Sequence, residues 1–292
     1  MRIAKSAAPI GAEIFDIDLA AGVDQNTFDA IVDAFHQHAV IGFRNQKTLS
    51  TEQQVAFSRR FGDLDVNVRS EFNKDGRPEV LVLSNITKDG KPIGVVDAGR
   101  YWHTDLCYLK KPARATILHA LEVPMDGSEP LGDTRYASMT AAYDALSADM
   151  KKRLSGLKAV HSYRYTYEKK ATDFKLRPKL AERGTDWLPP DVVHDVIRTH
   201  PYTGQKCLYV NEGYTTRIVD LPTHESDELL NELKAHAVQP RFQYVHKWAV
   251  GDLVMWDNCL TQHKATPDYA LPQRRLLERT TVLGAANIGA LA

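Results

Sequence analysis

Two histidines and one carboxylate in this chain of 292 residues have the types and the spacing that a metal site needs. His103 and Asp105 are separated by one residue, and His263 lies in the last part of the chain. Residues i and i+2 of a strand point to the same side, so His103 and Asp105 can reach one metal ion together. Fe(II) binds two imidazoles and one carboxylate on one face and leaves its other positions open for oxygen chemistry. The three residues therefore predict a non-haem iron site.

An arginine-rich segment follows His263 and supports its assignment as a metal ligand. Support is needed because His263 is one of eleven histidines and by itself is weak evidence for a metal site. When a 2-oxo acid supplies electrons to an iron oxygenase, its far carboxylate must be held in a largely dry cavity. A planar guanidinium does this well, because it pairs with both carboxylate oxygens. Under strand alternation, Arg275 and Arg279 face one side and Arg274 the other. We therefore expect Arg275 and Arg279 to point inward and Arg274 outward, although plain surface charges would give the same pattern.

Hydrophobic periodicity predicts the elements that must position these side chains. Helices are predicted over 27–39, 147–157 and 223–237. A capping-box pattern at Ser50 and Gln53 starts a further helix. Strands are predicted over 79–83, 115–123, 242–250, 253–256 and 276–283. This pattern favours a single domain over residues 1–292, mainly β with flanking α-helices, built as a β-sandwich or barrel. Residues 163–194 are polar without a clear period, so we interpret the segment at about 163–195 as a lid insertion.

The composition excludes several kinds of partner. Lys+Arg and Asp+Glu both number 37, so no basic excess points to nucleic acid. The first residues lack the apolar core of a signal peptide, and no apolar stretch approaches the ~20 residues that span a bilayer. The three cysteines, Cys107, Cys207 and Cys259, form no CxxC motif and are expected to be reduced thiols. We therefore expect a cytoplasmic protein with no nucleic-acid or membrane partner. A homo-oligomer, either a dimer or a tetramer, is a separate expectation.

Two other function classes are compatible with the same three ligand residues. A zinc hydrolase would use them to activate a water molecule, but it gives no role to the arginines. A non-catalytic binding protein would keep the fold with an inactive metal site. Dependence of turnover on oxygen and 2-oxoglutarate separates both from an iron oxygenase. A serine hydrolase has no support, since the chain lacks a GxSxG motif.

Four stretches of the chain carry a resemblance to a known family. They are WHTDLCYLKKPARATIL (102–118), GDTRYASMTAAYDAL (132–146), RTHPYTGQKCLYVNEGYTTRIVDL (198–221) and WDNCLTQHKATPDYALPQRRLLERTTVLG (256–284). The chain resembles the taurine dioxygenase family of Fe(II)- and 2-oxoglutarate-dependent oxygenases, which also includes phenoxyacetate-herbicide and alkylsulfate dioxygenases. The resemblance spans nearly the whole chain, and it implies a double-stranded β-helix, or jelly roll.

The resemblance also implies roles for individual residues. His103, Asp105 and His263 would bind Fe(II), and Thr134 and Arg275 would hold the distal carboxylate of 2-oxoglutarate. The residues expected to contact the primary substrate are Arg279, Tyr167, Tyr214, Leu106 and Asn211. The substrates would be O2 and a small anionic organic molecule. A sulfonate is predicted first, with taurine at the head, and a phenoxyalkanoate or an alkylsulfate is the alternative.

Three segments depart from the pattern of the taurine-oxidising member. Residues 128–131 (SEPL) are extra and precede the loop that carries Thr134. The residues after Gly62 lack the histidine that contacts the sulfonate, so Asn67 or Arg69 is expected to replace it. The stretch SNITKDGK (84–91) is more similar to the herbicide-degrading members.

Overall fold

The computed structural model describes residues 1–66, 70–174 and 179–284. Its α-helices are α1 Gln25–His38, α2 Thr51–Arg59, α3 Met139–Asp144, α4 Ala148–Leu154, α5 Tyr163–Asp173, α6 Leu180–Arg183 and α7 Thr223–Ala237, with 3-10 turns η1 Ser70–Phe72 and η2 Pro240–Phe242. Its strands are β1 Arg2–Lys5, β2 Ala12–Phe15, β3 Val40–Phe43, β4 Asn73–Lys74, β5 Arg77–Ser84, β6 Thr87–Lys88, β7 Lys91–Pro92, β8 Ala113–Glu122, β9 Met125–Asp126, β10 Glu129–Pro130, β11 Thr134–Ser138, β12 Lys158–His161, β13 Val192–Asp195, β14 Ile197–Thr199, β15 Lys206–Leu208, β16 Thr215–Ile218, β17 Gln243–His246, β18 Leu253–Asp257, β19 Thr261–Ala265 and β20 Leu276–Leu283.

The largest sheet has eight strands drawn from the beginning, middle and end of the chain. Their order is β1-β2-β3-β18-β8-β20-β5-β4, and only β2 and β3 run parallel among the neighbouring pairs. The middle strand β8 pairs with β18 on one side and β20 on the other. This pairing brings the arginine-bearing end of the chain beside the segment that follows His103 and Asp105.

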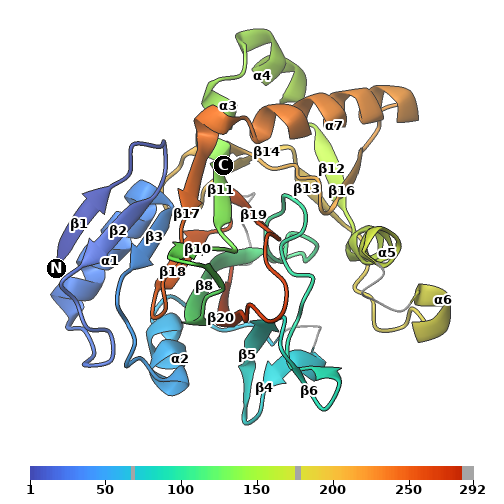
Figure 1. Ribbon diagram of the computed structural model, residues 1–292. Helices are drawn as coiled ribbons and strands as arrows, with labels where there is room; N and C mark the ends of the chain where they lie inside the picture. Colours follow the sequence, from blue (N-terminus) through green and yellow to red (C-terminus); the bar gives the residue numbers. More distant parts are fainter. Residues whose placement is uncertain (67–69, 175–178, 285–292) are drawn as a thin grey trace.

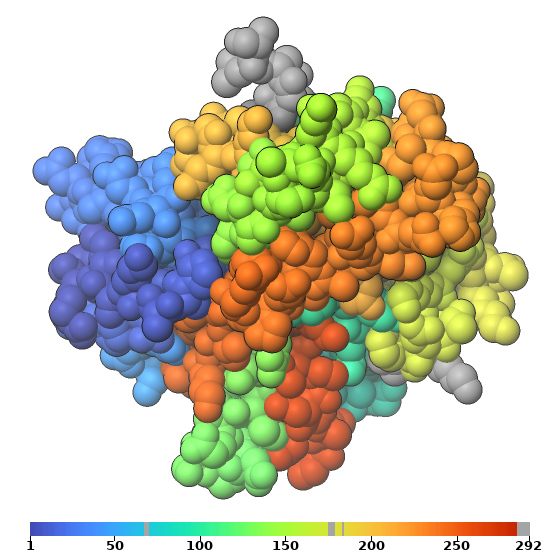
Figure 2. Space-filling view, turned by 90° about the horizontal axis from the view of Figure 1, so that it is seen from above, coloured from blue at the N-terminus to red at the C-terminus, as the bar shows by residue number. Residues whose placement is uncertain are grey.

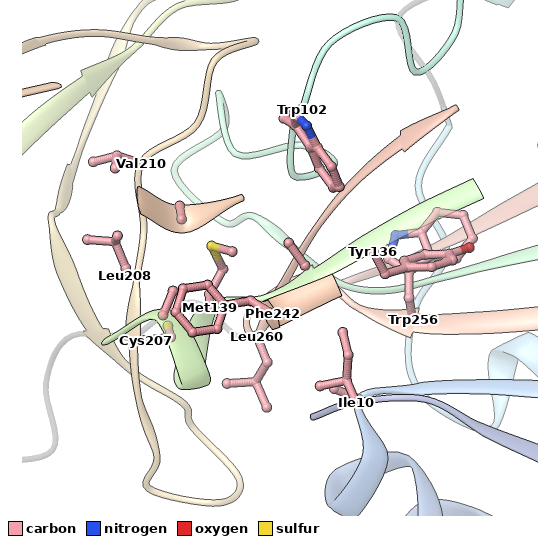
Figure 3. Close-up of a cluster of buried hydrophobic side chains, with 14 of the residues drawn as sticks. Ile10, Trp102, Tyr136, Met139, Cys207, Leu208, Val210, Phe242, Trp256 and Leu260 are labelled. Atoms are coloured by element: carbon pink, nitrogen blue, oxygen red, sulfur yellow. The ribbon is translucent and has the colours of Figure 1, made fainter. Parts of the chain in front are cut away.

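A smaller sheet, β17-β11-β19, packs against the inner face of the large one. Tyr136 of β11 and Trp256 of β18 meet between the sheets, with ring centroids 5.5 Å apart (Figure 3). Both belong to one apolar cluster with Leu83, Leu118 and Val254 from the large sheet. Burial of these side chains on two facing strand layers is the arrangement of a sandwich core. The region between the sheets is where the candidate site lies.

Helices α1 and α2 cover the outer face of the large sheet (Figure 1). Ile31 and Phe35 of α1 and Phe57 of α2 are buried against Ile41 and Phe43 of β3. The predicted capping box at the start of α2 is present, since the Ser50 and Gln53 side chains each bond the backbone N–H of the other residue. The helices α3, α4 and α7 lie together at another end of the sandwich (Figure 1).

Three predicted elements differ from the structure. The helix predicted over 147–157 ends at Leu154, and the strand predicted over 242–250 is reduced to Gln243–His246. The strand stops because the Asp252 carboxylate accepts a hydrogen bond from the Ala249 N–H and turns the chain. Residues 163–194 do contain regular structure, including the eleven-residue helix α5. Within the described ranges, no helix is long and apolar enough to span a membrane.

Candidate metal centre and co-substrate cavity

His103 and His263 are joined through their backbones as an isolated antiparallel β-bridge. The His103 N–H donates to the His263 carbonyl at 3.1 Å, and the His263 N–H donates to the His103 carbonyl at 2.8 Å. Their ring centroids are 4.1 Å apart. Residues far apart in sequence are therefore brought together by the pairing of an extended segment with the edge of β19.

Asp105 completes the cluster from a turn. The prediction that His103 and Asp105 share a strand is wrong, because the chain turns after the bridge and Leu106 has a positive φ of 52°. Asp105 nevertheless lies 3.6 Å (Oδ1) from His103 Nε2 and 3.8 Å (Oδ2) from His263 Nε2. The ligand atoms of the three residues lie within 4.8 Å of one another. The Thr116 hydroxyl donates to Asp105 Oδ2 at 2.7 Å and fixes the carboxylate.

The charge states of the three side chains suit a divalent metal. Burial would raise the pKa of Asp105, but the Arg279 guanidinium and the two imidazoles hold it well below its usual value. Burial and the neighbouring His103 push the pKa of His263 well below 6.5, so its imidazole is neutral. His103 Nδ1 lies 2.9 Å from the Tyr101 carbonyl, which makes Nδ1 the protonated nitrogen and leaves Nε2 free for a ligand bond. Two imidazoles that each offer a ring nitrogen, together with one carboxylate, fit Fe(II).

The three arginines point as predicted. Arg274 is exposed and pairs with Glu122 at 2.8 Å, whereas Arg275 is buried and the Arg279 side chain is only 12% exposed. Arg279 Nη1 donates to Asp105 Oδ1 at 3.3 Å. Arg275 has no carboxylate partner among the residues that the structure describes, and burial lowers its pKa. Its favourable neighbours are Tyr269, the Gly132 carbonyl and, at longer range, Asp268, so a direct ion pair with a carboxylate ligand would satisfy this buried guanidinium.

Two adjoining cavities meet at these side chains. Both are lined by Leu83, Ala98, Gly99, His103 and Arg279. The inner cavity is further lined by Thr134, Arg275, Trp256, His263 and Ala265. The outer cavity is further lined by Leu81, Val95, Asp105, Leu106, Tyr108, Tyr163, Thr166, Lys170 and Tyr214. The predicted co-substrate residues thus line one cavity, and the predicted substrate residues Leu106 and Tyr214 line the other.

The loop before Thr134 lies against the segment that carries Arg275. The extra residues 128–131 form the return of the β9–β10 hairpin. The Gly132 N–H donates to Asp268 at 2.7 Å, and Gln273 donates to the Met125 carbonyl at 3.1 Å (Figure 2, green beside red). Gly132 has a φ of +77°, and a Cβ there would lie 3.0 Å from Arg275 Nε. The inserted residues therefore leave Thr134 and Arg275 facing one cavity.

Two predicted substrate residues lie elsewhere. Tyr167 is fully buried on the flank of α5, with its ring 5.2 Å from that of Trp187, and it lines neither cavity. Asn211 is buried behind the cavity, where it accepts a hydrogen bond from the Tyr214 N–H at 2.8 Å. Sequence reasoning missed Tyr163 and Lys170, which line the outer cavity from α5. Residues at i and i+7 lie on the same face of a helix, so the spacing of Tyr163 and Lys170 would place both toward one cavity. The sequence analysis did not predict helix α5 and so did not use this spacing.

The candidates for replacing the missing histidine, Asn67 and Arg69, fall outside the described residues. Just before them, Asp65 lies within electrostatic reach of Arg279 and Asp105. Burial raises the pKa of the Asp65 carboxyl, and Arg279 opposes that rise. Asp65 is therefore a carboxyl group beside the substrate end of the site that sequence reasoning did not single out.

A second cluster of His200, Asp257 and Cys259 has the spacing of metal ligands. Both ring nitrogens of His200 already have partners, Thr203 Oγ1 at 2.8 Å and Asp257 Oδ2 at 3.0 Å. Asp257 also accepts a hydrogen bond from the Cys259 N–H at 2.7 Å. These bonds use both His200 ring nitrogens and both Asp257 carboxylate oxygens internally, so the cluster orders the turn after β18.

Known proteins share this architecture. A model of the family described as "Taurine catabolism dioxygenase TauD, TfdA family" matches residues 2–281. The chain belongs to this family. It is 37% identical over 259 residues to the alpha-ketoglutarate-dependent 2,4-dichlorophenoxyacetate dioxygenase of Burkholderia sp. (strain RASC), covering 85% of this chain and 82% of the relative. It is 33% identical to pentalenolactone F synthase of Streptomyces arenae, covering 93% and 91%.

A solved structure extends the comparison to the fold. The crystal structure of AAD-2 in complex with Mn(II) and N-oxalylglycine superposes with a TM-score of 0.79 at 30% identity, covering 97% of this chain and 98% of that one. The predicted jelly roll is confirmed by this match. Family membership makes the chain a non-haem Fe(II)- and 2-oxoglutarate-dependent dioxygenase, an oxidoreductase. The zinc hydrolase and the non-catalytic binding protein are thereby disfavoured.

Proposed function

We propose that His103, Asp105 and His263 hold the Fe(II), and that Thr134 and Arg275 hold the distal carboxylate of 2-oxoglutarate. The observation that carries this assignment is Arg275, a buried guanidinium without a described acidic partner, in a cavity that the histidine pair also lines. With O2 as the oxidant, bound Fe(II) and the two electrons from decarboxylation of 2-oxoglutarate would support hydroxylation of a substrate C–H bond. One oxygen atom would go to the substrate and the other to succinate, with release of CO2.

The protein's own contribution is charge, orientation and exclusion of water. Arg279 keeps Asp105 ionised, and Thr116 fixes the direction of its carboxylate. Arg275 pairs with an anion at the far end of the inner cavity, where burial strengthens the interaction. Tyr214 lies beside the metal ligands, with its ring 6.2 Å from that of His103, and closes one side of the outer cavity.

For the primary substrate, we propose a small organic acid with an uncharged, apolar body. Arg279 is the cation nearest the metal ligands in the outer cavity and would face the acidic group. Apolar and aromatic side chains, Leu81, Val95, Tyr108 and Tyr163 among them, line much of the rest. Such a lining suits a phenoxyalkanoate first and an apolar sulfonate or sulfate ester next. The relative of 37% identity acts on a phenoxyacetate, which supports the same order.

Taurine, placed first by sequence reasoning, ranks below these apolar acids. Its ammonium group would need a carboxylate, and Asp105 is already taken by the proposed metal site. Asp65 lies within electrostatic reach of Arg279 and could supply that charge. It does not line the outer cavity among the described residues, so taurine ranks below the apolar acids.

A substrate panel tests the proposal. Fe(II) and 2-oxoglutarate are added without oxygen, and succinate is then measured on oxygen addition with phenoxyalkanoates, sulfonates, sulfate esters, taurine and a neutral ether. We expect succinate formation to be fastest with an apolar acid and to fall when its acidic group is esterified. Equal rates with the acid and its neutral ester would contradict the role of Arg279.

Four further assignments stay predictions. They are the single domain, a lid formed by the segment at about 163–195, assembly as a homo-oligomer, and a cytoplasmic location. One observation supports the lid: Tyr163, Thr166 and Lys170 of α5 line the outer cavity. Limited proteolysis with and without substrate would show whether this segment becomes protected.

A further inference from the structure

Trp248 is a large buried side chain that lines neither cavity but touches the co-substrate site through one hydrogen bond. Its indole Nε1–H donates to Thr134 Oγ1 at 3.0 Å. Trp248 is 2% exposed and Thr134 is 4% exposed, so water does not compete for this bond. Thr134 lines the inner cavity together with Arg275.

The bond decides what the Thr134 hydroxyl can do. A hydroxyl carries one hydrogen and two lone pairs, whereas an indole N–H can only donate. Trp248 therefore occupies an acceptor position of Oγ1 and leaves the hydroxyl hydrogen for another acceptor. Among the described residues, none accepts a hydrogen bond of full geometry from the Thr134 hydroxyl, although the Tyr136 phenol lies near enough for the hydroxyl to lower its pKa against the larger effect of burial. An anion in the inner cavity would provide that acceptor.

We propose that Trp248 is a positioning residue: it orients the Thr134 hydroxyl so that its hydrogen points to the carboxylate held by Arg275. This inference rests on the proposed binding of 2-oxoglutarate at Thr134 and Arg275. Tyr136 lies two residues further on the same strand, fully buried, and its hydroxyl has no hydrogen-bond partner among the described residues. Without the indole, the Thr134 hydroxyl is free to rotate toward that phenol instead.

An ionic network holds Trp248 in place. The His246 ring lies edge-on to the Trp248 ring at 4.7 Å, and His246 Nε2 bonds Asp252 Oδ2 at 3.1 Å. Asp252 is in turn paired with Arg44, which also pairs with Glu13 on β2. The side chains of His246 and Asp252 are both buried, so their hydrogen bond restrains the position of the His246 ring against Trp248. The interruption of β17 after His246 is what lets Trp248 reach Thr134.

The test is calorimetric titration of 2-oxoglutarate into the Mn(II)-loaded protein without oxygen. Trp248→Phe keeps an aromatic side chain, though a smaller one, and removes the N–H donor. 2-Oxoglutarate should then bind about 3- to 10-fold more weakly, the usual effect of one buried hydrogen bond. In turnover, KM for 2-oxoglutarate should rise by the same factor while kcat changes little. Tyr244→Phe is the matched control, because it removes a hydroxyl near His246 on the same strand without touching Thr134.

A double-mutant cycle separates positioning from general loosening. Thr134→Val should itself weaken 2-oxoglutarate binding, and Trp248→Phe should then add no further loss. An equal loss from Trp248→Phe in both backgrounds, or wild-type affinity in Trp248→Phe, would overturn the positioning role alone. Wild-type affinity in Thr134→Val would overturn the assignment of Thr134 to the co-substrate, and the positioning role with it.

A second measurement covers the case in which Trp248→Phe does not fold. The indole N–H resonance of Trp248 is followed during titration of the Zn(II)-loaded protein with 2-oxoglutarate. The proposal expects this resonance to shift in the wild type and to shift much less in Thr134→Val, because the hydroxyl couples the indole to the anion. The same shift in both proteins, or none in the wild type, would contradict it.

Discussion

The Asp105 carboxylate is surrounded by two imidazoles and a guanidinium, so its negative charge has three partners. Replacement of His103, Asp105 or His263 by Ala should abolish turnover and weaken Fe(II) binding by more than about 100-fold, since even the outer partners of metal ligands typically contribute 10- to 100-fold. Metal titration of each purified variant, with its thermal unfolding midpoint as the folding control, checks this. A folded Asp105→Ala protein with wild-type iron affinity would show that the metal binds elsewhere.

Arg275 and its neighbour Arg274 form a natural comparison, because one is buried in the cavity and the other is exposed and paired with Glu122. Arg275→Ala should raise KM for 2-oxoglutarate by about 10- to 100-fold, the effect of losing a charge-assisted hydrogen bond. Arg275→Lys should recover part of this, since an ammonium lacks the planar fork. Arg274→Ala should match the wild type. Similar KM values for the two alanine variants would remove Arg275 from the co-substrate site.

At the scale of elements, the absence of a side chain at Gly132 lets the turn after the β9–β10 hairpin pack closely against Arg275. Gly132→Ala places a Cβ 3.0 Å from Arg275 Nε and from the Tyr269 ring, at a φ of +77°. We expect lower stability, by about 1–2 kcal/mol for the left-handed backbone, and a raised KM for 2-oxoglutarate. Gly127→Ala is the control: its φ is +58°, but nothing lies within 4 Å of its Cβ. It should show the stability loss with an unchanged KM.

A helix with a clear apolar face could be predicted from the sequence, and the helix that lines the site could not. Helix α7 begins and ends at the predicted residues because it buries the apolar stripe of Leu229, Leu230 and Leu233. Strand β20 also has its predicted bounds, although it buries Glu278 and Thr280 beside its apolar residues. Helix α5 was missed because its buried residues are Tyr163, Thr166, Tyr167 and Lys170, a face without a strong apolar pattern. That face is partly polar because part of it borders a cavity rather than the core.

The site could be predicted in its residues but not in its local geometry. The metal-ligand types and the inward direction of Arg275 and Arg279 followed from spacing and alternation. The turn that carries Asp105 could not be predicted in this way. A strand is only one of the backbone conformations that bring the side chains of residues i and i+2 to one point. The bond from Trp248 to Thr134 had no sequence signal, since it depends on an interruption of β17 by a network that includes Arg44.

At the scale of the whole molecule, buried histidines predict a loss of stability in acid. Burial, followed by the nearby Arg198, lowers the pKa of His194 from 6.5 to about 4. The folded state therefore favours neutral His194, and its contribution is fully present above the unfolded pKa and is lost as pH falls from about 6.5 to 4. His161, fully buried, has a pKa well below 6.5 and acts in the same direction.

Urea unfolding at about pH 7 and pH 5 measures this effect. The free energy of unfolding should fall between the two pH values, and the fall should be smaller in His194→Gln, which cannot titrate. His224→Gln is the control, because the His224 side chain is 82% exposed. If His194→Gln and His224→Gln lose the same stability as the wild type between the two pH values, His194 is not protonated on unfolding.

The central claim is that one pair of adjoining cavities holds both the metal and 2-oxoglutarate. A crystal structure of the protein with Mn(II) and 2-oxoglutarate, grown without oxygen and read by the anomalous signal of manganese, tests it most directly. A single strong peak is expected between His103 Nε2, His263 Nε2 and the Asp105 carboxylate, with the distal carboxylate of 2-oxoglutarate on Arg275 and Thr134. A peak at the other candidate cluster, His200, Asp257 and Cys259, or 2-oxoglutarate bound away from Arg275, would contradict it.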